Sequence, residues 1–161
     1  MKPKISSLSA DQNKLFMSLA MELANTAYSN DEVPVGAVIV QRKTSEVLAA
    51  FANQMRKLTC ATAHAEMLCI QKATSLLNNE RLVGCDIYVT LEPCPMCAHA
   101  ISIARIDRLF FGAEDQKSGG VVNGPKIFES SSCHHKPEVH KGIFMDESSS
   151  LLKSFFKAKR V

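Results

Sequence analysis

Four residues of this chain could act together in one chemical site: His64, Glu66, Cys94 and Cys97. They occur as His-x-Glu and, further along, as Pro-Cys-x-x-Cys. One imidazole and two thiolates suit zinc, an ion that takes four ligands. Three protein ligands leave one position for water, which is typical of a catalytic rather than a structural zinc site. The spacing therefore predicts one Zn²⁺ held by His64, Cys94 and Cys97.

In this interpretation Glu66 carries protons and is not a fourth ligand. It lies two residues after His64, where a carboxylate beside an open zinc position can accept and return protons. Zinc lowers the pKa of a bound water from about 15.7 to about 7. Attack on an amidine-like carbon would then release ammonia. We therefore expect a hydrolytic deamination with Glu66 as the catalytic residue.

The Cys-x-x-Cys pair has two other interpretations, a redox pair or half of a structural zinc finger. A finger needs two further ligands, and only Cys133-His134-His135 together with His140 could supply them. That cluster could bind a metal, but we favour a solvated loop. His99 could lie near the site, although surface exposure or packing is the more common role for such a histidine.

Length and composition describe one ordinary globular domain, which we expect to span residues 1–161. The hydrophobic share of 46% is enough for a full core, and the net charge of +3 says little by itself about nucleic acid. Residues 1–11 do not resemble a secretory signal, and no run approaches the ~18 apolar residues of a membrane span. Six cysteines without an export signal predict a reduced, cytoplasmic protein with no membrane segment.

Hydrophobic periodicity predicts helices that alternate with strands. A capping box at Ser9 starts the first helix, whose apolar stripe begins at Leu15 and Leu19, and Met67 faces the sheet from the second helix. The helices are expected to about residue 30, over 63–77, over 95–104 and from 146, and the strands over 35–40, 47–51, 87–91, 108–112 and 139–144. This order predicts an α/β fold, a three-layer α/β/α sandwich with a mixed five-stranded sheet. Ligands of such sheets bind at strand ends, where both metal-binding segments fall.

These motifs resemble those of the zinc-dependent nucleobase deaminases, the cytidine and deoxycytidylate deaminase superfamily, whose pattern is His-x-Glu followed by Pro-Cys-x-x-Cys. Within that superfamily the chain is similar to the bacterial-type tRNA-specific adenosine deaminases over nearly its whole length. The similarity includes the segments 32–38, 88–94 and 155–160.

The resemblance implies a cytidine-deaminase-like fold and conversion of the wobble adenosine of a tRNA anticodon to inosine. It implies one Zn²⁺ per subunit of a homodimer, a tRNA anticodon arm held across both subunits, and no DNA partner. Asn53 matches the family asparagine that hydrogen-bonds the flipped base, and the backbone near Val35 and Ala65 would line the same pocket. Asp115 and Lys117 lie in a loop that touches anticodon nucleotides in relatives.

The C-terminal residues 151–161 support an RNA partner independently. They contain four basic residues, Lys157 and Arg160 among them, no acidic ones, and the aromatic pair Phe155 and Phe156. Cations suit phosphates, and aromatic rings suit the splayed bases of an RNA loop. Alternatively, a phenylalanine packs the helix down while the basic side chains are solvated.

The chain departs from the family pattern at three places. Cys60-Ala61 stands where relatives carry Asp-Pro, and we expect a changed loop without loss of chemistry. His134-His135 replaces Asn-His, and His99 replaces a small residue. Two other functions stay open: a guanine or cytosine deaminase acting on free bases or nucleotides, and a non-catalytic RNA-binding subunit, which the presence of Glu66 disfavours.

Overall fold

Helices and strands alternate along residues 9–160, the part of the chain that the computed structural model describes. Expectations for residues 1–8 and for Val161 lie outside this range. The elements follow as α1 (Ala10–Ser29), β1 (Gly36–Gln41), β2 (Glu46–Ala52), α2 (Ala65–Leu77), β3 (Cys85–Leu91), α3 (Pro95–Ile103), β4 (Arg108–Ala113), the 3₁₀ turn η1 (Ile127–Glu129), β5 (Glu138–Lys141) and α4 (Met145–Lys159).

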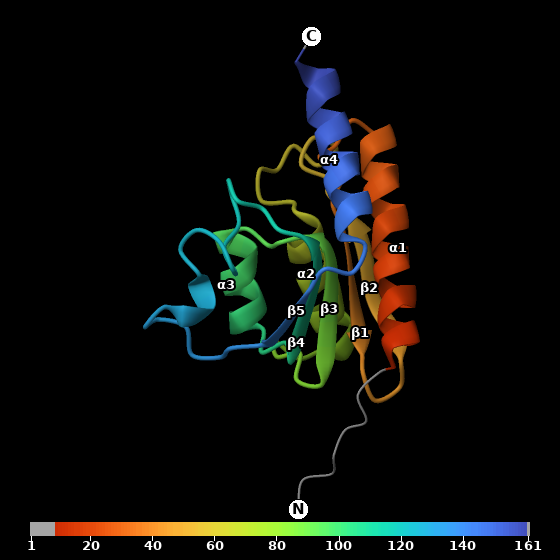
Figure 1. Ribbon diagram of the computed structural model, residues 1–161. Helices are drawn as coiled ribbons and strands as arrows, with labels where there is room; N and C mark the ends of the chain where they lie inside the picture. Colours follow the sequence, from red (N-terminus) through yellow and green to blue (C-terminus); the bar gives the residue numbers. More distant parts are fainter. Residues whose placement is uncertain (1–8, 161) are drawn as a thin grey trace, which may run out of the picture.

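A mixed sheet of five strands, in the order β2-β1-β3-β4-β5, organises residues 9–160 (Figure 1). β1 pairs antiparallel with β2 and with β3, whereas β3 pairs parallel with β4 and β4 with β5. β1 therefore runs against the other strands, and β2, β3, β4 and β5 all end at one edge of the sheet. We call this edge the carboxyl edge. The connections that leave these strands begin there, and β1 starts there.

Helices cover both faces of the sheet, which confirms the predicted three-layer α/β/α sandwich. α1 and α4 lie side by side on one face, while α2 and α3 pack on the other (Figure 1). The larger core includes Ile87 and Leu109 and lies beneath α2 and α3, and a smaller core around Phe16 and Tyr88 lies beneath α1. Among the helices of residues 9–160, none combines the length and the apolar character needed to cross a membrane.

The buried face of α1 differs from the predicted stripe because its backbone approaches β1 closely. The capping box between Ser9 and Gln12 is present. A Cβ atom on Gly36 would lie only 2.0 Å from the carbonyl oxygen of Ala20, so the helix can come this close only because position 36 has no side chain. Ala20 is buried at this contact, whereas Leu15, the first residue of the predicted apolar stripe, is 57% exposed.

Three further expectations about the elements are corrected. The last strand ends at Lys141 rather than at residue 144, because Gly142 and Phe144 have φ angles of +104° and +56°, which an extended strand cannot contain. The second helix begins at Ala65 rather than at residue 63. Met67, which was expected to face the sheet, is half-buried. Cys69 is the fully buried residue at this part of the helix.

Candidate active site

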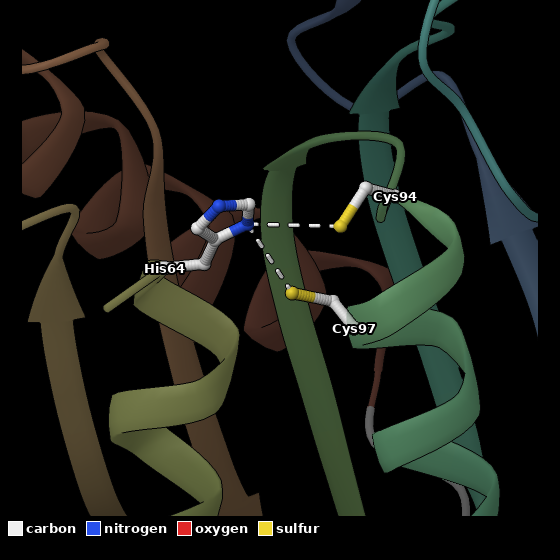
Figure 2. Close-up of side chains that lie close together, drawn as sticks. All are labelled: His64, Cys94 and Cys97. Carbon is white, nitrogen blue, oxygen red and sulfur yellow. Dashed lines mark hydrogen bonds between the residues drawn. The ribbon is translucent and has the colours of Figure 1, made fainter. Parts of the chain in front are cut away.

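The three predicted metal ligands lie at the starts of two helices that begin at the carboxyl edge. His64 is the N-cap of α2, and Cys94 is the N-cap of α3. Pro95 occupies the first helical position, which proline favours, and Cys97 follows one turn into the helix. Figure 2 shows the three side chains pointing toward one another from the two helices. The tertiary structure thus brings together residues that are 30 positions or more apart in the sequence.

The distances between these side chains fit a tetrahedral zinc ion. His64 Nδ1 lies 3.6 Å from Cys94 Sγ and 3.5 Å from Cys97 Sγ. Nitrogen and sulfur ligands at usual zinc bond lengths and a tetrahedral angle would be about 3.6 Å apart. Within residues 9–160, no other group of three His, Cys, Asp or Glu side chains is placed to hold a metal ion. The residues present therefore fit Zn²⁺, with Nδ1 as the ligating atom of His64.

The electrostatics of the site favour a thiolate at Cys94. A hydrogen bond from the Cys97 thiol is the main cause that lowers the pKa of Cys94, to about 4. Burial acts in the opposite direction, and His64 lowers this pKa further. The same hydrogen bond, together with burial, raises the pKa of Cys97. Two helix N-termini also direct the positive ends of their dipoles toward the sulfurs. A divalent cation between the sulfurs would displace the remaining thiol proton, because zinc binds cysteine as the thiolate.

Glu66 is buried beside these ligands and has an unused oxygen. Its side chain is 4% exposed, and among the described residues Oε1 has no hydrogen-bond partner. Burial raises the pKa of its carboxyl group. A buried polar atom without a protein partner is costly unless water or a ligand satisfies it. This orphaned oxygen therefore fits a site where a water molecule binds at the open position of a zinc ion.

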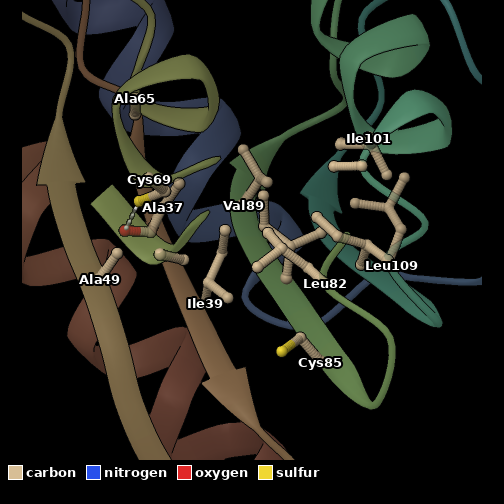
Figure 3. Close-up of a cluster of buried hydrophobic side chains, with 14 of the residues drawn as sticks. Ala37, Ile39, Ala49, Ala65, Cys69, Leu82, Cys85, Val89, Ile101 and Leu109 are labelled. Atoms are coloured by element: carbon tan, nitrogen blue, oxygen red, sulfur yellow. Dashed lines mark hydrogen bonds between the residues drawn. The ribbon is translucent and has the colours of Figure 1, made fainter. Parts of the chain in front are cut away.

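The core beneath α2 and α3 holds the two helix starts in place. Ala65 and Cys69 belong to the buried face of α2, and the Cys69 thiol donates a hydrogen bond to the carbonyl oxygen of Ala37 on β1 at 3.2 Å (Figure 3). Ile101 of α3 joins the same cluster as Leu109 of β4 (Figure 3). Because both helices pack on one continuous core, the positions of their first residues are fixed relative to each other.

A cavity of about 1060 Å³ opens from the metal ligands along the carboxyl edge. Its walls come from the segment before β1, the segment after β2, the connections after β3 and β4, and one face of α4. The α4 residues are spaced as neighbours on one helix face: Ser149, Leu152, Lys153, Phe156, Lys157 and Arg160. The cavity is therefore built from connections that the strand directions bring to one edge.

The cavity contains most of the predicted substrate contacts, namely Val35, Asn53, Asp115, Lys117, Phe156, Lys157 and Arg160. Phe155 is not among them. Its ring is 7% exposed and packs edge-on against Tyr28 of α1, with the ring centroids 5.7 Å apart. Phe155 thus holds α4 down, and Phe156, which is 45% exposed, is the aromatic side chain that faces the cavity.

Asn53 has one end of its amide fixed by the protein. Its Oδ1 accepts a hydrogen bond from the backbone N–H of Ala65 at 2.8 Å. Ala65 itself is fully buried and is not part of the cavity wall, so its N–H serves Asn53 rather than a substrate. With Oδ1 engaged as an acceptor, the Nδ2 group is the part of this amide that remains to donate to a ligand in the cavity that Asn53 lines.

Asp115 organises its own loop. Its Oδ1 accepts backbone hydrogen bonds from Lys117 at 3.1 Å and from Ser118 at 2.9 Å. One carboxylate oxygen of Asp115 is thus engaged in a turn, and Lys117 in that turn is exposed.

The segment predicted as a solvated or metal-binding loop is instead anchored to the end of α3. The carbonyl oxygen of His135 accepts a hydrogen bond from Ser102 Oγ at 2.6 Å, and His135 Nε2 donates to the carbonyl oxygen of Ile106 at 2.7 Å. Cys133 also contacts Ser102 Oγ, at 3.2 Å. The expectation of a solvated loop is therefore wrong for Cys133 and His135, while His134 is exposed.

The segment that departs from the family pattern at Cys60 keeps a hydrogen-bonded turn. The Cys60 N–H donates to the carbonyl oxygen of Met55 at 2.9 Å, and the Ala63 N–H donates to the carbonyl oxygen of Cys60 at 3.1 Å. These backbone hydrogen bonds hold the turn in place. Ala63, directly before His64, is buried, so the turn fixes the position of His64 at the start of α2.

Comparison with known proteins supplies the family. Residues 10–113 match the model of the cytidine and deoxycytidylate deaminase zinc-binding region. A tRNA-specific adenosine deaminase from Agrobacterium fabrum is 49% identical over 146 residues, which cover 91% of this chain and 95% of that protein. This chain belongs to the tRNA-specific adenosine deaminases.

Solved structures support the same family for this deaminase. A structure from a study of A-to-I editing by tRNA:A34 deaminases at the wobble position of transfer RNA is 48% identical, with a TM-score of 0.83. The match covers 86% of this chain and 99% of that one. A guanine deaminase from Nitrosomonas europaea has a TM-score of 0.77 at 22% identity, covering 93% of this chain and 86% of that one, and shares the fold.

The ligand assignment predicts that Cys97→Ser loses bound zinc. The serine hydroxyl is a poor zinc ligand, so elemental analysis should find about one ion per chain in the wild type and a small fraction of that in the variant. Cys60→Ser is the matched control, because Cys60 is exposed and lies outside the trio. Full zinc content in Cys97→Ser would contradict the assignment.

Proposed function

We propose that this chain hydrolytically deaminates the wobble adenosine of a tRNA anticodon to inosine. The observation that carries the proposal is the continuity of one cavity, which starts at His64, Glu66 and Cys94 and continues past Asn53 to the basic face of α4. Membership in the tRNA-specific adenosine deaminases supports the same substrate.

The rim of the cavity favours an RNA segment over a free base. The volume of about 1060 Å³ alone does not choose between them, because small-ligand pockets typically reach about 1,000 Å³. Its rim carries exposed cations, with Lys117 on one side and Lys153, Lys157 and Arg160 on α4. Phosphates next to a flipped nucleotide would meet these charges, and Phe156 would offer its ring to a base.

The residues of the site divide the proposed reaction among themselves. Zinc, when bound, supplies a water of lowered pKa. Glu66 accepts one proton from the attacking water and transfers it to a ring nitrogen of the adenine. It then takes the second proton from the hydroxyl group added to the base and gives it to the departing amine, so that the carbon–nitrogen bond breaks and ammonia leaves. Asn53 donates from Nδ2 to the base and orients it. The overall reaction consumes one water and releases ammonia and inosine.

We also propose that the active form is a homodimer in the cytoplasm, with the anticodon arm held across both subunits. Two large apolar side chains on the helices α2 and α3 are exposed, Leu76 at 54% and Ile103 at 66%. A second subunit could cover them. None of the six cysteines, all of which lie within residues 9–160, forms a disulfide, which suits a reducing compartment. Light scattering of the purified chain measures the subunit number, and a monomer at all concentrations would refute the dimer.

The substrate assignment predicts selective ammonia release. The zinc-loaded protein should deaminate an anticodon stem-loop with adenosine at the wobble position and should leave guanine and cytosine unchanged, because free bases cannot engage the basic rim. The same stem-loop with guanosine at that position is the matched control. Turnover of guanine with none of the stem-loop would replace this proposal by a free-base deaminase.

Glu66→Ala should retain zinc and lose turnover, because the three ligands remain while the proton carrier is removed. Loss of a general acid–base group lowers the rate by about 10²–10⁴-fold. Single-turnover deamination of the stem-loop and zinc analysis measure the two effects separately. Glu22→Ala, which removes an exposed carboxylate of α1, should change neither. A wild-type rate in Glu66→Ala would show that another group moves the proton.

Lys157→Ala combined with Arg160→Ala should weaken stem-loop binding in a salt-dependent way. Each phosphate contact contributes about 0.7 to the slope of log affinity against log salt for a single strand, so the slope should fall by about one to two. Lys43→Ala with Lys72→Ala removes two exposed cations outside the cavity and should leave the slope unchanged. An unaltered slope in the first variant would remove α4 from the RNA site.

A further inference from the structure

Glu92 is a buried carboxylate whose hydrogen bonds all come from one distant loop. It directly follows β3 and is 2% exposed. Its Oε1 accepts from the Asp115 N–H at 3.0 Å and from Asn123 Nδ2 at 2.7 Å. Its Oε2 accepts from the N–H groups of Val121 and Val122 at 3.0 Å and of Asn123 at 3.1 Å. The two oxygens thus collect five donors from the loop 114–123.

The loop 114–123 also packs tightly against the start of α3, the helix that carries Cys97. The Gly120 N–H donates to the carbonyl oxygen of Pro93 at 2.8 Å. A Cβ atom on Gly120 would lie 2.5 Å from the nitrogen of Pro95, and one on Gly119 would lie 2.4 Å from Glu92 Oε2. The loop and the segment 92–95 are therefore packed as one unit, in which any displacement of Glu92 shifts the loop.

The chemistry of the five partners requires a carboxylate at position 92. All of them are N–H donors, and a carboxylate offers acceptor sites only. A glutamine would have to direct its NH₂ group at N–H donors in either orientation of its amide. The charge also strengthens each bond, since hydrogen bonds to an ionised acceptor are stronger than neutral ones.

Glu92 links the two parts of the proposed function. It stands two residues before Cys94, and the loop that it holds carries Asp115 and Lys117 into the cavity wall. Glu92 itself borders the cavity, but its oxygens are engaged by the loop. The cation that could meet a phosphate of the RNA from this side is therefore Lys117, at a place that Glu92 determines.

We propose that Glu92 is a positioning residue for the RNA substrate. It holds the loop 114–123 at a set distance from the metal ligands, so that nucleotides bound by the loop place the target base beside Glu66. This inference rests on the proposed function. Through the loop, Glu92 affects how tightly the substrate binds, and it takes no part in proton transfer.

The test is Glu92→Gln, prepared with zinc and assayed with the anticodon stem-loop. We expect KM to rise about tenfold while kcat changes less than about threefold, because one set of charged hydrogen bonds is lost and the catalytic groups remain. Hydrogen exchange of the backbone amides of 115 and 121–123 should accelerate, and zinc content should stay unchanged. Glu46→Gln removes an exposed carboxylate on β2 and should alter none of these values.

A second variant keeps the inference testable if Glu92→Gln does not fold. Asn123→Ala removes only the side-chain donor to Oε1 and leaves Glu92 in place, so KM should rise about threefold in the same direction. A fall in kcat at constant KM, unaltered amide exchange, or loss of zinc in a folded Glu92→Gln would each overturn the inference. Failure of the proposed function is distinguishable, because the wild type would then not process the stem-loop at all.

Discussion

The direction of the strands is the constraint on which the rest of this structure depends. Because β1 alone runs against the others, the connections after β2, β3, β4 and β5 all begin at the carboxyl edge. Asn53 and His64 follow β2, Cys94 and Cys97 follow β3, the loop 114–123 follows β4, and α4 follows β5. A metal site, a base pocket and a basic rim can therefore meet, although their residues span more than 100 positions of the sequence.

Three buried glutamates near this edge use their carboxylate oxygens in different ways. Glu92 accepts five hydrogen bonds and holds one loop. Glu32 Oε1 accepts the N–H groups of Arg56 and Lys57, each at 2.8 Å, and so holds the turn on the other side of the cavity. Glu32 Oε2 and Glu66 Oε1 both have no partner among the described residues, so a free oxygen alone does not mark a reactive carboxylate. Glu66 differs from Glu32 because it stands among the metal ligands, where a carboxylate can exchange protons with a bound water.

Two errors of the sequence interpretation originate in side-chain direction. Leu15 fits a helical stripe, but the face of α1 that approaches Gly36 buries Ala20 and Ala24 and leaves Leu15 exposed. Phe155 and Phe156 are equivalent in composition, yet adjacent helix positions point about 100° apart, so one packs on Tyr28 and the other faces the cavity. The importance of Glu92 was missed because its partners follow it by 23 to 31 residues in a loop without a regular pattern.

The sequence by itself determined the chemistry and the order of the elements, because ligand types, the one-turn spacing of Cys94 and Cys97, and hydrophobic periodicity are local properties of the chain. Only the tertiary structure decided which atom of His64 meets the sulfurs, which phenylalanine faces the cavity, and that Asn53 receives its orientation from the Ala65 N–H. These facts depend on contacts between segments that are distant in sequence. Such contacts are selected by packing of the whole core, which no local pattern encodes.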